Sequence, residues 1–318
     1  MCYSAMVEQR HKEWLRYQAQ IAEQAFESLF ERRLTDGRIR IAKALELNYA
    51  EPRTPSEIRT RAHIDAWRAR AMGEHEAALF ASRQRLADAE RRLRTKQTKK
   101  ALEDRRIASS KVEWHRRKLA ELARTVPEPE DARIFPFWYA PVAIMEHGRL
   151  TVRPMRYHCR PHDKPASLDK RFGGLYNARR DSLEGFWGNL FGRRHGVAIF
   201  TSFFENVALH DFEHRALRPG EKPRNLVLHF DPQPAMPMLV ACLWDVWRRP
   251  GAPELHSFAT ITDEPPPEVA ATGHERCIIP LKEANLEAWL TPAGRDRRAL
   301  HALLDDRERP YYAHAIAA

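Results

Sequence analysis

The stretch Thr95-Lys96-Gln97-Thr98-Lys99-Lys100 (TKQTKK) lies in the middle of the most regular part of the chain. Residues 56–126 around it contain no proline, and Gly73 is their only glycine. Because a polar turn separates two stripes of apolar residues at helical spacing, the pattern predicts a coiled-coil hairpin of two long antiparallel helices over about residues 55–126. The two ends of such a hairpin should lie close together. The stripe residues are Ile58, Ile64, Trp67, Ala71, Phe80, Leu86 and Leu93 before the turn, and Leu102, Val112, Leu119 and Leu122 after it.

The predicted hairpin carries most of the net charge of the protein. Residues 55–126 hold 19 Lys and Arg against 10 Asp and Glu, a surplus of nine, whereas the whole chain has a formal charge of +10. Two interpretations stay open. The surplus is a solvated helix surface, which is the usual origin of charge-rich helices, or it is a contact for nucleic acid or for a protein partner.

After Asp131 the composition changes to segments rich in β-branched and aromatic residues, separated by Pro and Gly. These segments predict a curved, mostly antiparallel, barrel-like sheet, and the chain as a whole is predicted to be an α+β protein. One further helix is expected over residues 6–34, and shorter ones near Asp181, over 283–290 and over 295–304. The predicted strands are Ile134–Met145, Leu150–Tyr157, Val197–Phe204, Asn225–Phe230, Met238–Trp247, Phe258–Thr262 and Cys277–Leu281.

Several classes of protein are excluded by the composition. With 318 residues, the chain is long enough for one large or two ordinary domains. Its longest apolar run, Met238 to Trp244, is far shorter than the roughly 20 residues of a membrane-spanning helix. Charged residues begin at Glu8, so no secretory signal is expected. Four cysteines without paired spacing are typical of reduced thiols. We therefore expect a cytoplasmic protein without a membrane, a metal or another cofactor.

Cys2 stands out because of its position. A cysteine in second place is small enough to permit removal of Met1, which would leave an α-amine and a thiol on adjacent carbons. Such a 1,2-aminothiol reacts with an aldehyde to give a Schiff base, and the thiol then closes a five-membered thiazolidine ring. It can equally act as an N-terminal nucleophile, with the amine as the base for its own thiol.

Three later stretches, together with Cys2, resemble the SRAP family (SOS-response-associated peptidase domain). The stretches are Tyr176–Ser182 (YNARRDS), Phe203-Phe204-Glu205 and His274-Glu275-Arg276. They occur in the order that the family shows, and Trp289 falls where the family has a tryptophan. The resemblance covers residues 1–5 and roughly 133–290. It therefore divides the chain into an N-terminal catalytic strand (1–5), a helical insertion with the hairpin (6–130) and the main α+β domain (131–318).

The resemblance implies a DNA-damage-response enzyme that crosslinks abasic sites in single-stranded DNA through Cys2, with AP-lyase activity and autoremoval of Met1. Glu205 would move protons during opening of the sugar and exchange of the Schiff base. His274 would act as an acid at the sugar oxygen. Asn177 would hold the α-amine or the sugar oxygen. Arg179 and Arg276 would bind DNA.

The chain departs from the family pattern next to the nucleophile. The family usually opens with Cys-Gly-Arg, whereas Tyr3 and Ser4 follow Cys2 here, so an arginine expected to contact DNA is missing. An alternative function is a thiol peptidase or amidase that uses the same N-terminal nucleophile on an external substrate. A third class is a non-catalytic module whose hairpin binds DNA or a protein.

Overall fold

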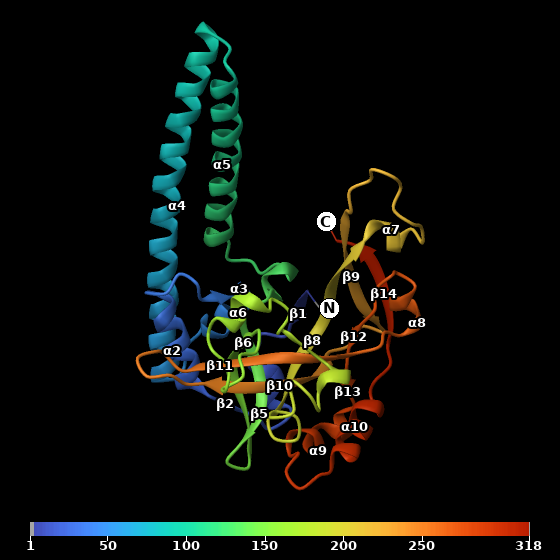
Figure 1. Ribbon diagram of the computed structural model, residues 1–318. Helices are drawn as coiled ribbons and strands as arrows, with labels where there is room; N and C mark the ends of the chain where they lie inside the picture. Colours follow the sequence, from blue (N-terminus) through green and yellow to red (C-terminus); the bar gives the residue numbers. More distant parts are fainter. Residues whose placement is uncertain (1–2, 318) are drawn as a thin grey trace.

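The computed structural model describes residues 3–317, in which a long helical hairpin stands on a sheet-based body (Figure 1). The hairpin consists of α4 (Pro55–Thr95) and α5 (Lys99–Ala123), as predicted from the sequence. A capping box between Thr54 and Glu57 begins α4, with Pro55 in its first turn. The Thr98 hydroxyl accepts a hydrogen bond from the Ala101 N–H at the start of α5. The two caps thus determine where α4 and α5 begin.

The two helices of the hairpin differ in length, so the expectation that its ends lie close together is wrong. α4 has 41 residues and α5 has 25. At about 1.5 Å per residue, the difference leaves the start of α4 roughly 24 Å beyond the end of α5. That lower part of α4 packs on α2 (Glu23–Arg33) instead of on α5 (Figure 1). Buried Ile64 is part of the resulting hydrophobic contact.

The body is built on one curved sheet, and the α+β, barrel-like fold class is confirmed. Within residues 3–317 the sheet has fourteen strands, and its main path is β13-β10-β11-β6-β5-β8-β1-β4. β10 also pairs with β8, which closes a ring of five strands. Most pairs are antiparallel. The strands are β1 (Ser4–Val7), β2 (Gln20–Ile21), β3 (Arg40–Ile41), β4 (Arg133–Ile134), β5 (Trp138–Glu146), β6 (Arg149–Tyr157), β7 (Asn177–Arg179), β8 (His195–Ala208), β9 (Asn225–Gln233), β10 (Met238–Trp247), β11 (Leu255–Asp263), β12 (Cys277–Ile278), β13 (Pro280–Leu281) and β14 (Tyr311–Ile316).

The helix expected over residues 6–34 forms mainly in its second half, as α2. The chain there forms β1, a single turn α1, the short strand β2 and then α2. β1 pairs with β8, and β2 pairs with β6, so the sheet takes up residues whose local spacing favoured a helix. Near Asp181 the predicted helix is only a 3₁₀ turn, Arg180–Ser182. The remaining helices are α1 (Lys12–Leu15), α3 (Lys43–Glu46), α6 (Leu168–Arg171), α7 (Leu209–Phe212), α8 (Pro267–Ala270), α9 (Leu286–Leu290) and α10 (Arg297–Asp305).

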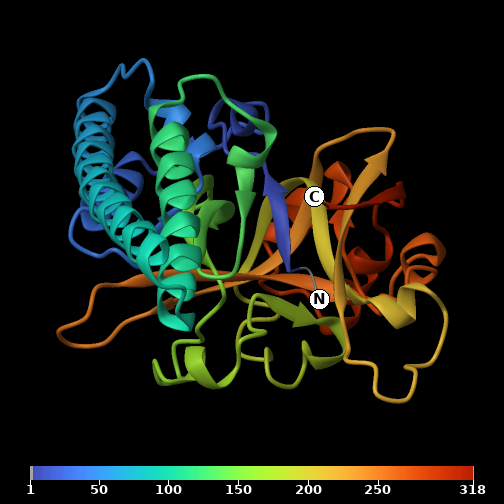
Figure 2. The ribbon, with the colours of Figure 1, turned by 90° about the horizontal axis from the view of Figure 1, so that it is seen from above.

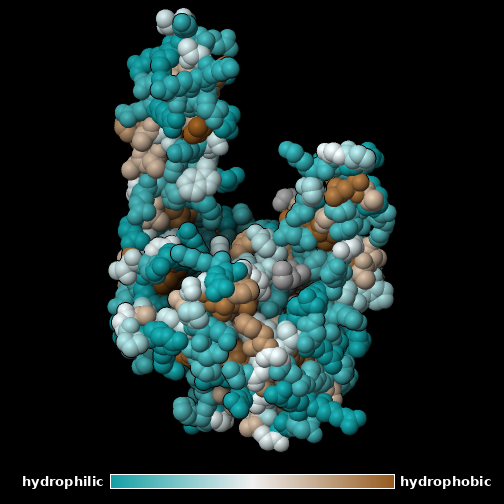
Figure 3. Space-filling view, viewed as in Figure 1, coloured by the Kyte–Doolittle hydropathy of each residue, from teal (hydrophilic) through white to brown (hydrophobic). Residues whose placement is uncertain are grey.

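The apolar run of β10 is explained by burial on both faces of the sheet. Leu239, Ala241 and Leu243 belong to one hydrophobic cluster, whereas Met238 and Val240 belong to the other. Seen from above, the hairpin lies on one flank of the sheet and β9 with β14 on the opposite flank (Figure 2). The surface is hollowed between these two parts (Figure 3). None of the helices in residues 3–317 combines the length and the apolar character needed to cross a bilayer.

Candidate functional site

Glu205 lies near the end of β8 with its side chain on the face that carries Phe203 and Val207. It has no exposed surface. The strand is fixed on both sides, because Phe204 pairs with Ser4 of β1 and Glu205 pairs with Leu228 of β9. A carboxylate in an apolar cluster needs compensation by a polar group.

His274 provides that compensation. Its Nε2 lies 3.3 Å from Oε2 of Glu205, and the histidine is 9% exposed. The other ring nitrogen, Nδ1, is held by the backbone of Arg276, whose carbonyl lies at 2.9 Å and whose N–H lies at 3.3 Å. The ring is therefore fixed at both nitrogens, and Nε2 faces the carboxylate. The structure thus brings together two of the residues predicted from the motifs.

The loop that carries His274 depends on Gly273. The chain leaves α8 and reaches Gly273 with φ of +84°, a conformation that favours glycine. A Cβ at this position would lie 2.8 Å from Cβ of Asp211 in α7. The motif search did not single out Gly273, although a glycine directly before the histidine was visible in the sequence.

Asn177 occupies the first position of β7 and is 5% exposed. β7 pairs with β11, and the Thr260 hydroxyl donates to Oδ1 of Asn177 at 2.9 Å. No hydrogen-bond partner for its Nδ2 is present in residues 3–317. β11 also pairs with β12 at Cys277, three residues after His274. One strand thus supports both Asn177 and the segment that follows the histidine.

The two predicted DNA-binding arginines differ in their surroundings. The Arg179 side chain is about half exposed and forms an ion pair with Asp181 at 2.5 Å. Arg276 is partly exposed and acts on the site through its backbone, which holds the ring of His274. That the guanidinium groups of Arg179 and Arg276 contact DNA remains a prediction.

Cys2 lies outside the described residues. The described chain begins at Tyr3, whose N–H donates to the carbonyl of Phe204 at 3.1 Å, directly before Glu205 in the sequence. Arg133 adjoins this strand, because its Nε and Nη2 donate to Oγ of Ser4 at 3.1 and 2.9 Å. Its guanidinium carbon lies 3.5 Å from the centre of the Phe204 ring. Sequence reasoning missed Arg133, because only the β1–β4 pairing brings it there.

Cys159, Cys242 and Cys277 are buried and reduced. Burial raises the pKa of all three thiols, and for Cys277 the nearby Glu205 carboxylate raises the pKa further. None of these three thiols is therefore activated as a nucleophile. In residues 3–317, no group of three or more His, Cys, Asp or Glu side chains is arranged to hold a metal ion.

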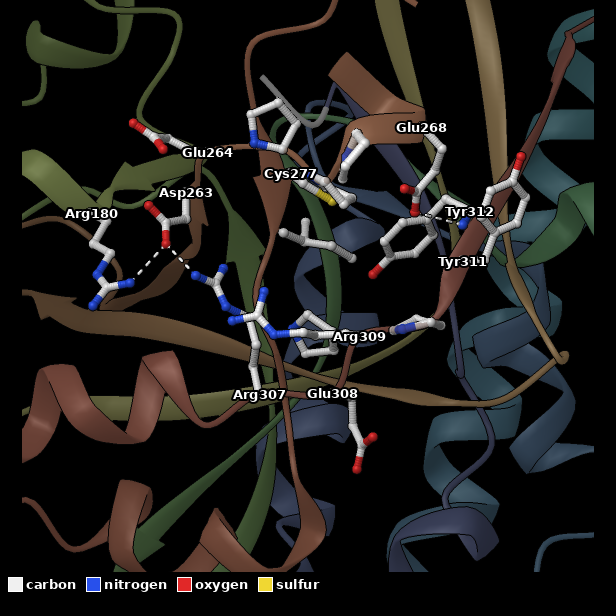
Figure 4. Close-up of a pocket in the computed structure, with 16 residues that line it drawn as sticks. Arg180, Asp263, Glu264, Glu268, Cys277, Arg307, Glu308, Arg309, Tyr311 and Tyr312 are labelled. Atoms are coloured by element: carbon white, nitrogen blue, oxygen red, sulfur yellow. Dashed lines mark hydrogen bonds and ion pairs between the residues drawn. The ribbon is translucent and has the colours of Figure 1, made fainter. Parts of the chain in front are cut away.

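A cavity of about 670 Å³ lies beside β12 and β14 (Figure 4). Prolines line it, and Cys277 and Tyr312 form part of its wall. Asp263 accepts hydrogen bonds there from Arg180 at 2.8 Å and from Arg307 at 2.5 Å. Burial opposes ionisation of Asp263, but these two bonds lower its pKa below the usual value. These ion pairs join β11 to the segment before β14 and support the wall that contains Cys277.

The comparison with known families agrees with the motifs. The structure defines an α+β domain around a barrel-like sheet, with a buried carboxylate–imidazole pair beside its first strand. The family model of SRAP, SOS response associated peptidase, matches residues 91–317, and the match begins inside the hairpin. The chain belongs to the SRAP family, which is associated with the response to DNA damage.

Three solved structures are similar to the chain. A protein from Bacteroides thetaiotaomicron has a TM-score of 0.46 and 14% identity, over 58% of this chain and 77% of its own. A protein from Bordetella bronchiseptica has a TM-score of 0.45 and 18% identity, over 62% and 90%. A phage-related protein from the same organism has a TM-score of 0.43 and 17% identity, over 58% and 80%. These scores are below 0.5, so the family assignment rests on the sequence model. A search of curated proteins finds no match.

Proposed function

We propose that this protein forms a covalent thiazolidine crosslink between Cys2 and abasic sites in single-stranded DNA. AP-lyase activity and autoremoval of Met1 belong to the same proposal. The observation that carries it is the buried pair of Glu205 and His274, 3.3 Å apart. Glu205 lies on β8, the strand that pairs with the start of the described chain.

The surroundings of the cysteines support the same assignment. The chain has four cysteines, and three of them are buried with raised pKa values. This leaves Cys2 as the candidate nucleophile. It also has the only α-amine that a cysteine of this chain can offer, once Met1 is removed.

The proposed reaction needs proton transfers that the site residues suit. The abasic sugar opens when a proton reaches its ring oxygen and the C1′ hydroxyl loses one, and we assign these transfers to His274 and Glu205. The Cys2 amine then adds to the C1′ aldehyde and water leaves, which gives a Schiff base. The thiol sulfur adds to the imine carbon, and its proton passes to the nitrogen. The net reaction releases one water. Asn177 would hold the amine or the sugar oxygen through its Nδ2 group.

Lyase activity would follow from the same Schiff base. Loss of a C2′ proton allows the C3′–O bond to break, so that the 3′ phosphate leaves and a carbon–carbon double bond forms. Closure of the thiazolidine competes with this elimination, because the thiol removes the imine. The balance between the two products thus depends on how fast the Cys2 thiol adds.

The test is incubation with single-stranded oligonucleotide that contains an abasic site, followed by a denaturing gel. The expected result is a shifted band that is lost in Cys2→Ala, and intact mass spectrometry should show that Met1 has been removed. Retention of Met1 on protein that crosslinks, or a thiazolidine in Cys2→Ala, contradicts the proposal. Peptide cleavage without a shifted band would indicate the N-terminal-nucleophile peptidase instead. The absence of both peptide cleavage and a shifted band would indicate a non-catalytic binding module.

A further inference from the structure

A second pocket lies between the base of the hairpin and the sheet. Its volume is about 300 Å³, near the lower end of the usual range for small-ligand sites. Three partly buried aromatic side chains line it: Trp67 of α4, Phe135 between β4 and β5, and Trp138 of β5. The rings of Phe135 and Trp138 have centroids 5.5 Å apart. A flat ligand would complete the burial of these rings.

The pocket is held in shape by buried and half-buried ion pairs. Glu46 accepts from Arg33 at 2.6 Å and from Arg68 of α4 at 3.0 Å. Lys43 donates to the carbonyl groups of Glu121 and Arg124, at 2.5 and 2.8 Å, near the end of α5. These contacts fix both helices of the hairpin to the body. The pocket is therefore formed before any ligand binds, which lowers the cost of binding.

The charges of the lining suit a neutral polar ring better than a phosphate. Four cations line the pocket, and their charge is balanced by four carboxylates. The cations are Arg33, Lys43, Arg68 and Arg133, and the carboxylates are Glu46, Glu121, Glu130 and Asp131. An anion inside the pocket would meet these carboxylates at short range. A nucleobase is uncharged, stacks on aromatic rings and offers edge groups that charged side chains can bind.

The pocket lies beside the start of the described chain. Phe135 contacts Tyr3 edge to face, with ring centroids 5.9 Å apart. Arg133 lines the pocket and also donates to Ser4. A strand bound with its lesion at residue 2 would therefore have its neighbouring nucleotide within reach of the pocket.

From this placement we propose that the pocket binds the nucleobase next to the abasic site on the same strand. The proposal rests on the proposed function for the position of the lesion. The base stacks on Trp138, and the Phe135 ring, which is inclined at 55° to that of Trp138, contacts the edge of the base. Nη1 of Arg133, which takes no part in the two bonds to Ser4, would donate to the backbone of the strand. The hairpin thus acts as one wall of a binding site.

The test uses the full-length protein and short single strands that carry an uncleavable tetrahydrofuran analogue of the abasic site. In two further strands, a second analogue replaces the base on the 5′ side or on the 3′ side. We expect loss of the base on one side to weaken binding about tenfold, as for removal of one base–aromatic stack. Trp138→Ala should bind all three strands with the same affinity, and more weakly than the wild type binds its preferred strand. The matched control Trp114→Ala, on an exposed part of α5, should keep the discrimination.

Leu122→Trp gives an independent variant that fills the pocket from the hairpin side, and it should also remove the discrimination. Equal binding of all strands by the wild type overturns the proposal, as does discrimination that persists in folded Trp138→Ala or Leu122→Trp. The same preparations are assayed for crosslinking to a natural abasic site. Crosslinking without a base preference overturns only the pocket assignment, whereas a base preference without crosslinking overturns the proposed covalent function.

Discussion

Glu205 is a buried carboxylate in contact with the His274 imidazole, and the proposed function gives it the role of a proton carrier. Glu205→Gln keeps the size and the hydrogen-bonding capacity of the side chain but removes its ionisable proton. We expect crosslink formation to slow by a factor of about 10²–10⁴, the usual range for a general acid or base. The measurement is the single-turnover rate on abasic single-stranded DNA.

Glu275→Gln is the matched control for this prediction. Glu275 is exposed and directly follows His274 in the sequence, so the same chemical change there should leave the crosslinking rate unaltered. A wild-type rate in folded Glu205→Gln would assign Glu205 to the structure instead of to the reaction.

Gly273 is predicted to be required for the position of His274. Gly273→Ala places a Cβ 2.8 Å from Asp211 in a backbone conformation with φ of +84°. Gly148 has φ of +74° but open space around it, so Gly148→Ala reports the conformational cost alone. We expect about 1 kcal/mol of destabilisation for Gly148→Ala and about 1–3 kcal/mol more for Gly273→Ala, because the second change also creates a clash.

Urea unfolding of the two glycine variants measures these costs. Only Gly273→Ala should also slow crosslinking, because only this change displaces the loop that holds His274. Equal destabilisation in both variants would mean that α7 moves to accept the extra atom.

At the scale of elements, the hairpin combines a base that is built into the body with a distal part in which α4 and α5 pack on each other (Figure 1). Arg85 and Asp104 pair across the distal part, and Nδ1 of His75 lies 3.0 Å from Nδ1 of His115 below it. Residues 80–110 hold ten Lys and Arg against four Asp and Glu. Replacing residues 80–110 with a short Gly/Ser turn would thus remove a surplus of six positive charges and keep the base.

We predict that this truncated variant still crosslinks at saturating DNA but binds more weakly at low salt. Its log–log salt dependence should be shallower, by about 0.7 for each phosphate contact that is lost. The measurement is the affinity for an uncleavable single strand across a salt series, with the full-length protein as the reference. Equal slopes would mean that the distal charges are solvated or meet a protein, and failure to crosslink at saturation would show that the distal part helps to form the site.

The elements that the sequence predicted well are those with strong local signals. The hairpin has caps at Thr54 and Thr98, and β10 coincides with its apolar run. β1 has only four residues, and β7 has three, so pairing with distant strands determines them. The different lengths of α4 and α5 follow from the predicted turn at residues 95–100. The packing of the start of α4 on α2 could not be predicted, because it is a tertiary contact.

The residues of the candidate site also differ in whether local sequence signals could predict them. Glu205 and His274 were predicted from short motifs, and the structure places them in contact. Asn177 was predicted as well, and it is fixed to β11, the strand that also pairs with β12. Arg133 carries no motif, since its place beside Ser4 follows from strand order alone.

At the scale of the whole molecule, β8 connects the parts of the protein. It pairs with β10 and β5 in its first half, and with β1 and β9 near Glu205. His195 begins this strand and is 2% exposed. Its Nε2 accepts from the Gly192 N–H at 2.8 Å, and its Nδ1–H donates to the Trp289 carbonyl at 2.9 Å. The bond from Gly192 requires the neutral ring, because a protonated Nε2 cannot accept a hydrogen bond.

Acid should therefore destabilise the fold through His195. Burial lowers the pKa of His195 to about 3, although the bond to Trp289 opposes this shift. The unfolded chain, with a histidine pKa of about 6.5, then binds more protons than the native state between pH 6.5 and 3, so stability falls as the pH drops through this window. At pH 5 the loss relative to pH 7 should be about 2 kcal/mol from this residue. Other buried groups add to the total, so the contribution of His195 is obtained by difference.

The measurement is urea unfolding at pH 7 and pH 5 for the wild type, His195→Gln and Trp289→Phe. His195→Gln loses the native hydrogen bonds of the imidazole and should be less stable than the wild type at pH 7. The free energy of unfolding should then fall between pH 7 and pH 5 by about 2 kcal/mol less in this variant than in the wild type. Trp289 stacks on His195 and donates to the Gly196 carbonyl at 3.0 Å. Trp289→Phe disturbs the same packing without removing a titratable group, so it should lower stability at both pH values and keep the pH dependence. A pH dependence in His195→Gln as steep as that of the wild type would show that His195 is not the group that acid protonates on unfolding.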